Sequence, residues 1–547
     1  MPRLLYTRTV FAVLVAASAL HAAPRPDEKT GGPAVVGQAK SLHDLIEMVK
    51  ATVKNLGGDK LYQEFEKNAL PELDFNQIAG IDPKRPFGLY ATVDADFSKS
   101  RAVFLVPVKG EKEFVAMLED FQIKVNPGKD PGTYDVVVPP DFPLPVAVRI
   151  HKQYAYVSLG GFDALDPKVL LDPKDVIRDK EPAAVYLSIR PERIPVEARK
   201  FLLSSLTEQT DHLKEEIPEP ALKEAFEQGR RLVGRWVRML AEEGKEVALR
   251  LDADTKTGDV SLEVSVDGVP KSPLAEAIAR RGPTKNAFAS LAGDDYAYRT
   301  FMSAPLFAEE MKDVWTHLIE YGQREAAADL AGAPPEVVAL AEAGFKSLKA
   351  TIGSGEFDLA AAVRGPDKDG FYTAVGAVHC REAAGLEKAI KAALKHLPQE
   401  MQGLYKLDAH KIGDVSVHEI DLTTVAEDTA KKVFGKGQKG YVAFGKSSVC
   451  AAYGPDGLKL LKEALEAKPG PAPVYEATTD GKRIKELVKR LMPEGNPNGP
   501  NQHFMAGSWA SSLGGMKVTV DGGDRLKIRM TYNVGMFMMF FGAYAVE

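Results

Sequence analysis

The stretch FGLYATVDADFSKSRAVFLVPV, residues 87–108, decides the fold class, because it returns in the second half of the chain as FDLAAAVRGPDKDGFYTAVGAV, residues 357–378. The two stretches align without a gap, and Phe87 and Leu89 fall on Phe357 and Leu359. Apolar residues alternate along a first strand, a polar turn follows, and a second apolar strand closes the stretch. Each stretch therefore predicts a β-hairpin with a buried face. Two copies so far apart predict a tandem duplication.

Three further pairs of segments recur in the same order in the two halves of the chain. They are YAYVSLGG (154–161) with VCAAYGPD (449–456), PAAVYLSIRPERI (182–194) with PAPVYEATTDGKRI (471–484), and the hairpins 247–266 with 516–532. The alternative is two unrelated domains that share only strand composition.

Helices are interleaved with these strands. EKEFVAMLEDF (111–121) places its apolar residues on one helix face, and hairpin-length loops separate the strands around it. This pattern predicts the α+β class, as a tandem duplication of a largely antiparallel sheet with helices packed on it. The Gly282-Pro283 pair marks the boundary, so the first repeat is expected at 39–283 and the second at 284–547.

The N-terminus resembles a secretory signal peptide. Arg3 and Arg8 precede the 11-residue apolar run of residues 10–20, and small residues follow, so cleavage is expected near Ala22 or Ala23. The alternatives are an uncleaved anchor or a buried helix. Residues 1–23 are thus a predicted signal peptide, and the mature chain is expected in the periplasm or outside the cell.

A flexible leader is expected at 24–38, where the sequence is polar and rich in proline and glycine. Ser41 then opens a helix, with Asp44 three residues later as in a capping box.

Charge and hydropathy restrict the partners. Cleavage would leave 68 basic and 76 acidic residues, a net charge of −8, which disfavours nucleic acid as a partner. No apolar stretch of the mature chain reaches the roughly 18 residues that a membrane span needs, so no transmembrane segment is expected there. An apolar ligand or an envelope protein partner remains open.

The chain contains two cysteines, Cys380 and Cys450, both in the second repeat. An oxidising compartment would permit one disulfide between them, and the alternative is two buried free thiols.

Candidate chemistry is sparse. Asp252, Asp254 and Asp259 suggest calcium, but Lys256 stands where an EF-hand needs an oxygen ligand, so a hairpin turn with Gly258 at positive φ is favoured. His379 and His418 lack the spacing of a helical zinc site, and a surface or hydrogen-bonded histidine is favoured for each. No nucleophile elbow, phosphate loop or cofactor motif appears, so no cofactor, metal or catalytic residue is assigned.

Two amphipathic segments have competing interpretations. The helix QGRRLVGRWVRML (228–240) places Arg231, Arg235 and Arg238 on one face, opposite an apolar face that includes Val233. Pairing of Arg231 with Glu227 favours a solvated face over an anion site. The tail YNVGMFMMFFGAYAV (532–546) is interpreted as a core element, with an interaction surface for lipid or a partner as the alternative.

The segment GIDPKRPFGLY (80–90), the signal-like N-terminus and the repeated α+β halves together resemble large exported bacterial proteins of unknown function. This resemblance implies no activity and no site residue. The expected role is a non-enzymatic binding or structural one in the envelope or outside the cell. The alternatives are a carrier of an apolar ligand and a hydrolase with a site assembled across the repeats.

Overall fold

The computed structural model describes residues 32–68, 78–96, 99–138, 145–201, 203–204, 220–303, 309–355, 357–423, 428–491 and 515–533. Its contacts divide the chain into two compact units. Unit 1 comprises Met1–His212 with Trp236–Ala275, and unit 2 comprises Leu213–Arg235 with Glu276–Glu547. Helices and antiparallel strands together confirm the α+β class.

The sheet of unit 1 contains ten described strands, and every neighbouring pair is antiparallel. In spatial order they are β4 (Val125–Pro127), β5 (Thr133–Val136), β6 (Val146–His151), β7 (Tyr154–Leu159), β3 (Arg101–Pro107), β2 (Phe87–Thr92), β1 (Val35–Ala39), β8 (Val185–Ile189), β9 (Gly244–Ala253) and β10 (Asp259–Gly268).

Strand β1 corrects the expected leader. The sequence predicts a flexible segment at 24–38, but Val35–Ala39 pairs with β2 on one side and with β8 on the other. Val36 is 3% exposed, because its side chain lies on the buried face beside Tyr90. The flanking proline and glycine residues conceal a short strand whose partners lie far away in sequence.

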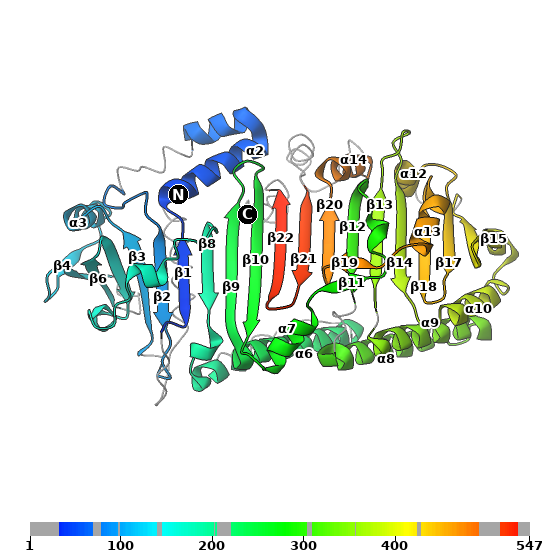
Figure 1. Ribbon diagram of the computed structural model, residues 1–547, viewed down its shortest axis with the longest axis horizontal. Helices are drawn as coiled ribbons and strands as arrows, with labels where there is room; N and C mark the ends of the chain where they lie inside the picture. The colour runs from blue at the N-terminus through cyan, green and yellow to red at the C-terminus, as the bar shows by residue number, and fades with distance from the viewer. Residues whose placement is uncertain are drawn as a thin grey trace. The chain divides into compact units, whose positions relative to one another are not determined.

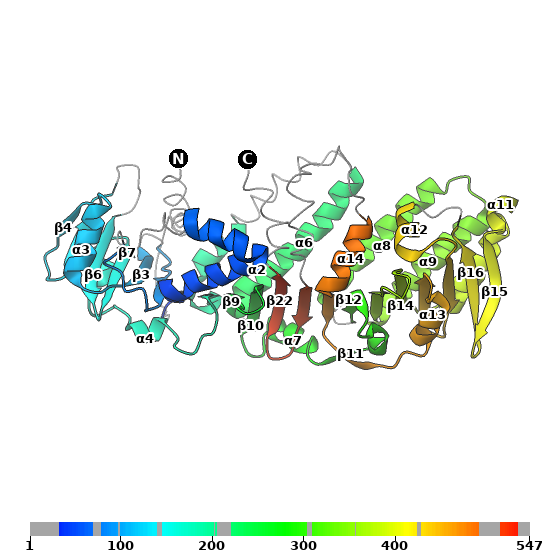
Figure 2. The ribbon, with the colours of Figure 1, turned by 90° about the horizontal axis from the view of Figure 1, so that it is seen from above.

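Both faces of this sheet are covered by local elements. On one face Tyr90, Leu105 and Tyr156 pack against residues of η2 (Phe162–Leu165) and α4 (Pro173–Val176). On the other face, Phe114 and Met117 of α3 (Glu111–Asp120) pack against the strands. The long helix α2 (Leu42–Asn68) lies beyond the strand ends, near the turn between β9 and β10 (Figures 1 and 2).

In unit 2, ten described strands also pair antiparallel with their neighbours. In spatial order they are β15 (Tyr405–Ile412), β16 (Val415–Asp421), β17 (Lys439–Phe444), β18 (Ser448–Tyr453), β14 (Thr373–His379), β13 (Leu359–Arg364), β12 (Tyr296–Met302), β20 (Tyr475–Thr479), β21 (Met516–Asp521) and β22 (Leu526–Asn533). A small separate sheet pairs β11 (Thr284–Asn286) with β19 (Gly470–Ala472).

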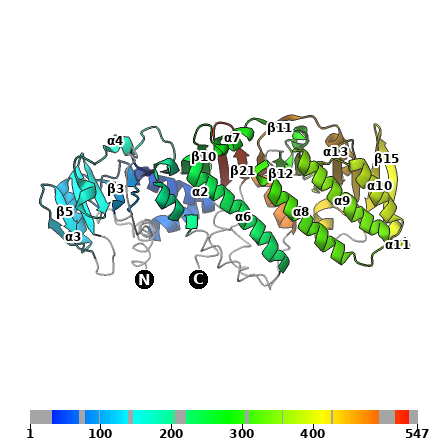
Figure 3. The ribbon, with the colours of Figure 1, turned by 90° about the horizontal axis from the view of Figure 1, so that it is seen from below.

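Helices α8 (Glu309–Asp329), α9 (Pro335–Ser354) and α10 (Ala383–Leu394) follow one another along one side of unit 2 (Figure 3). The core of the unit lies where Leu460 and Leu461 of α13 (Gly457–Leu465) pack against the central strands. The remaining short elements are η3 (Pro191–Arg193), α7 (Pro273–Arg280), η4 (Ala289–Ala292), α11 (Gln399–Gln402), α12 (Asp428–Phe434) and α14 (Gly481–Leu491).

Candidate functional site

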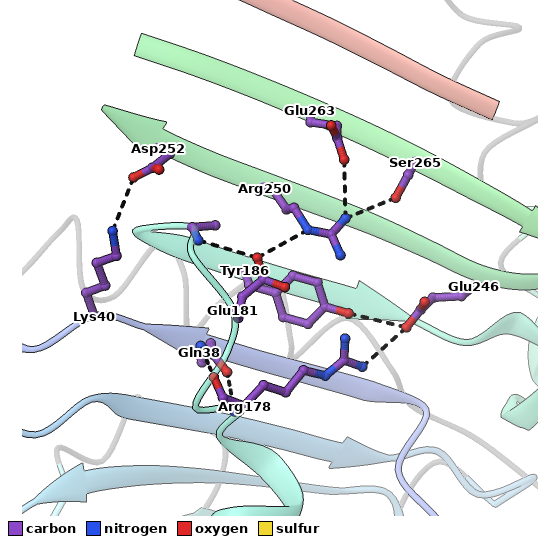
Figure 4. A network of polar contacts seen from close by, with 11 residues as sticks. Gln38, Lys40, Arg178, Glu181, Tyr186, Glu246, Arg250, Asp252, Glu263 and Ser265 are labelled. Carbon is purple, nitrogen blue, oxygen red and sulfur yellow. Dashed lines mark hydrogen bonds and ion pairs between the residues drawn. The ribbon is translucent and has the colours of Figure 1, made fainter. Parts of the chain in front are cut away.

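A polar network crosses one face of unit 1 where β1, β8, β9 and β10 lie side by side (Figure 4). Its centre is Tyr186, which is 1% exposed. The guanidinium groups of Arg178 and Arg250 lie 4.6 and 5.0 Å from the centre of the Tyr186 ring. Cation–π attraction in such a buried place holds both arginines against the sheet.

Arg250 has three partners. Its Nε donates to Glu181 over 3.2 Å, and its Nη1 lies 3.5 Å from a Glu263 oxygen and 3.2 Å from the Ser265 hydroxyl. The side chains of Glu181 and Glu263 are only 6% and 12% exposed, so these ion pairs are shielded from water. Alternation along the strands places Arg250, Glu263 and Ser265 on one face.

Glu246 is the second anchor of the network. It accepts a hydrogen bond of 2.6 Å from Ser188 and one of 3.3 Å from the Tyr186 hydroxyl. Arg178 and Arg190 lie 3.6 and 3.8 Å away. Burial acts to raise the pKa of Glu246, but the Ser188 hydrogen bond and the two arginines outweigh it and lower the pKa. Glu246 therefore stays ionised at neutral pH.

A cavity of about 610 Å³, the unit 1 cavity, opens next to this network. Its walls come from the end of β1, the first turns of α2, the turn before β2, the segment after α4 and the end of β9. The lining residues are Gln38, Lys40, Ser41, Asp44, Glu47, Met48, Lys84, Pro86, Ile177, Arg178, Asp179, Glu181, Ala253 and Thr255.

The first turn of α2 is closed by its own side chains. Ser41 Oγ accepts from the Asp44 amide over 3.1 Å and donates to the Asp44 carboxylate over 2.6 Å, which confirms the predicted cap. Lys40 pairs with Asp252 over 3.4 Å, so the cavity wall is tied to β9. The cavity wall is polar, and most of its charged groups already have partners.

One of the two candidate histidines, His418, lies in unit 2 in a cluster that resembles a metal site. His418 of β16, Glu387 of α10 and Asp408 of β15 place their ligand atoms within 4.8 Å of one another. The other candidate, His379 at the end of β14, is not a member of this cluster. The Lys391 ammonium, however, lies 2.7 Å from Glu387 and 2.9 Å from Asp408. A protein cation therefore already pairs with both carboxylates.

The backbone also selects the tautomer of His418. Its Nδ1 accepts from the Asp408 amide over 3.0 Å, so the proton resides on Nε2, which donates to Glu387 over 3.1 Å. A protonated Nε2 cannot ligate a metal. His418 is 6% exposed and hydrogen-bonded on both nitrogens, as the favoured interpretation of the sequence expects. The adjacent Glu419 points to the other strand face, where it contacts His410 and Lys439.

Cys380 and Cys450 are buried free thiols, and the structure does not form the possible disulfide between them. Cys450 lies opposite Ala377 in the ladder, whereas Cys380 bonds through its amide to Ser447. Three residues along a strand separate the two positions by about 10 Å and place them on opposite faces. Burial raises the pKa of Cys450 to about 11, which keeps this thiol protonated.

The aspartates of residues 252–259 form the predicted turn. Gly258 has φ of +75°, and Asp254 Oδ1 accepts from the Lys256 amide over 2.7 Å in the connection between β9 and β10. On α6 (Pro220–Glu243), Arg231 lies 3.6 Å from Glu227, which confirms that predicted pair. Val233, on the opposite, apolar face, is 59% exposed.

The signal segment 1–23 lies outside the described residues, as does the part of the tail that follows Asn533, where β22 ends. None of the described helices combines the length and apolar character that crossing a membrane requires.

The residues of the polar network and the cavity are absent from the sequence-based candidates. They come from five separated segments, and no local motif links them. A weak signal exists in β8, where Tyr186 occupies an inward position between apolar residues, but its arginine partners belong to other segments of the chain. No family model, curated protein or solved structure matches the chain.

Proposed function

We propose that this chain is an exported, non-enzymatic binding protein built from two duplicated units, and that unit 1 holds a small polar ligand in its cavity. The observation that carries the binding role is the cavity of about 610 Å³ beside a network of paired charges. Small-molecule sites commonly enclose roughly 300–1,000 Å³. Walls fixed by ion pairs are preorganised, so little conformational freedom is lost when a ligand binds.

The chemistry of the walls favours a polar ligand over an apolar one. Seven of the lining side chains carry a formal charge, namely Lys40, Lys84, Arg178, Asp44, Glu47, Asp179 and Glu181. A lipid chain placed there would remove these groups from water without giving them hydrogen bonds, which is unfavourable.

The strand order supports duplication. The strands of the two units can be matched one to one in chain order. The strands β1, β2 and β3 then correspond to β12, β13 and β14, the strands β4–β7 to β15–β18, and the strands β8–β10 to β20–β22. With this matching, the order of the strands in space is the same in both units. A helix follows the first hairpin in each unit, α3 after β3 and α10 after β14. Unrelated sheets of this size have many other possible orders.

The ladder registers support it as well. The strands β2 and β3 begin at Phe87 and Arg101, and β13 and β14 begin at Leu359 and Thr373, so the spacing between the two strand starts is identical in the two units. Each of the repeated segments falls on matched strands.

Polar character also recurs at the matched position. Glu476 is the second residue of β20, as Tyr186 is the second residue of β8, so Glu476 stands where unit 1 has Tyr186. Glu476 is 7% exposed and lies 3.0 Å from Arg299 and 3.3 Å from Lys517. Both units thus place polar groups on the matched strands, with different residues.

Export rests on the sequence of residues 1–23. Edman sequencing of the protein recovered from its native host would test it, and a mature N-terminus near Pro24 is expected. A chain retaining Met1 or Pro2 at its start would contradict export by cleavage.

The binding role is tested by filling the unit 1 cavity. Met48→Trp places an indole in the cavity, whereas Val49→Trp alters the neighbouring residue, which is 43% exposed and not part of the lining. Thermal shift against amino acids, short peptides, sugars and nucleotides should identify a compound that stabilises the wild type and Val49→Trp but not Met48→Trp. Equal stabilisation of all three proteins, or of none, would overturn the binding role.

A further inference from the structure

We infer that the ligand of the unit 1 cavity is a zwitterion of the amino-acid or short-peptide class, whose carboxylate is held by Lys84 and whose ammonium is held by Asp179. This inference rests on the proposed binding role of the cavity. It names the chemical class of the ligand and the two residues that select it.

Most charges of the cavity wall already have a partner. Lys40 pairs with Asp252 over 3.4 Å, and Glu47 pairs with Lys50 over 2.9 Å. Glu181 pairs with Arg250 over 3.2 Å. Similarly, Arg178 lies 3.6 Å from Glu246, and Asp44 is bonded to Ser41. The four ion-paired groups stabilise the wall and have little charge left for a ligand. Asp44 keeps its charge, because Ser41 is neutral, but its carboxylate is engaged in the cap of α2.

Two lining residues of opposite sign differ from the others. Within the part of the chain that the structure describes, neither Lys84 nor Asp179 forms an ion pair with another side chain. Both side chains are exposed at the cavity, so a ligand can reach them without breaking an existing contact. A ligand that brings one group of each sign would neutralise both of these residues.

The turns that carry these two residues are fixed by the backbone. The Lys84 amide donates to Asp82 over 3.0 Å, and the His43 amide of α2 donates to the Pro83 carbonyl over 2.8 Å. On the other side, Gln38 bonds to both the amide and the carbonyl of Arg178, at 2.6 and 3.3 Å. Gln38 is 7% exposed, and it positions the turn that continues to Asp179. The backbone that carries the two charged side chains is therefore held in place.

A peptide backbone also fits the remaining wall. The apolar side chains of Met48, Pro86 and Ile177 lie between the charged groups and offer contact for small side chains. A sugar would leave Lys84 and Asp179 without neutralising partners, and a nucleotide would add charge of one sign only. The zwitterion is the class that satisfies both signs.

The test uses tri-alanine with free ends and two capped forms, the N-acetyl and the C-amide peptides, titrated calorimetrically into the full chain. Exposed ion pairs contribute about 0.2–1 kcal/mol, so each cap should weaken binding roughly 1.4- to fivefold. Lys84→Gln should weaken the free peptide by the same factor but leave the affinity for the C-amide unchanged. Asp179→Asn should also weaken binding of the free peptide by this factor, but it should leave the affinity for the N-acetyl peptide unchanged. The matched control is Lys180→Gln, an exposed neighbour outside the lining, which should bind all three peptides as the wild type does.

The outcomes separate the two proposals. Affinities independent of the caps, or a loss in Lys180→Gln equal to that in Lys84→Gln, would overturn the zwitterion. If maltotriose stabilises the wild type but not Met48→Trp while tri-alanine binds neither, the binding role stands and the zwitterion falls. If tri-alanine binds Met48→Trp as tightly as the wild type, the cavity is not its site and the inference falls.

Discussion

Glu246 stays ionised because Ser188, Tyr186 and two arginines favour its charged form. Replacing it by glutamine keeps the shape but leaves Arg178 and Arg190 without this counter-charge. We expect Glu246→Gln to lower the free energy of unfolding by about 1–3 kcal/mol at pH 7. Urea unfolding followed by circular dichroism measures this loss.

The pH dependence of that loss has a definite sign. A carboxylate whose pKa is lowered in the folded state stabilises the protein above its unfolded pKa of about 4.3, and this stabilisation is lost as the pH falls through the folded value. The gap between wild type and Glu246→Gln should therefore shrink from pH 7 to pH 3. A gap of the same size at both pH values would show that the charge of Glu246 is not what stabilises the network.

His418 provides a second test at this scale. Its Nδ1 accepts the Asp408 amide proton, so we expect nitrogen-15 NMR of histidine-labelled protein to report the Nε2-protonated tautomer at neutral pH. Adding Zn²⁺ should leave the His418 resonances in place, because Lys391 already lies between Glu387 and Asp408. His418→Gln assigns the signals. A proton on Nδ1, or a zinc-dependent shift at His418, would restore the metal site.

Single residues were predictable only where their partners are local. The Ser41 cap and the Gly258 turn follow from spacings of a few residues, and both are present. The partners of Arg250 are Glu181, which is distant in sequence, and residues of β10. Such contacts depend on which strands are neighbours in the sheet, and the spacing of residues in the sequence does not reveal that order.

Among the elements, β1 is the one whose importance the sequence conceals. We expect Val36→Asp to cost at least about 3 kcal/mol, because it buries a charge between Tyr90 and Ser188 in the middle of the unit 1 sheet. The control, Val49→Asp, changes a residue of α2 that is 43% exposed and should cost little. Urea midpoints of the two variants give the comparison. Equal midpoints would mean that β1 does not belong to the folded core.

For the hairpins β2–β3 and β13–β14, the sequence alignment and the matching of the strand starts differ by two residues. The ungapped alignment sets Phe87 on Phe357, whereas matching the strand starts sets Phe87 on Leu359. A slip of two positions keeps every side chain on its face, since strands alternate with a period of two. Hydrophobic alternation therefore predicted the hairpin and its buried face, but it could not determine the register.

At the scale of the whole chain, sequence order and spatial order diverge. The unit 1 cavity combines residues 38–48 and 84–86 with 177–181 and 253–255, and only the strand order brings them together. Four matching segments were enough to suggest two halves. They could not indicate the cavity, because its charged residues have no counterparts in the second half that the alignment would detect.

The matched strand orders lead to a prediction for the intact chain. In each unit, the second strand of the first hairpin and the strand beside it have a partner on both sides. These strands are β3 and β7 in unit 1 and β14 and β18 in unit 2. The strands β4 and β15 each pair with a single neighbour among the described strands. Amides paired and buried on both sides open only with the sheet itself, whereas strands with one neighbour open locally.

Hydrogen exchange followed by mass spectrometry should therefore give the same ranking in both units, with β3, β7, β14 and β18 slowest and β4 and β15 fastest. The matched strand order makes this a comparison of corresponding strands within one sample, so solution conditions cannot account for a difference. Helix α3 and helix α10, which follow matched hairpins, serve as a second matched pair. The contradicting result is that β15 exchanges as slowly as β14 while β4 exchanges faster than β3. The matched strands of the two units would then open differently, and the shared strand order would not reflect a shared architecture.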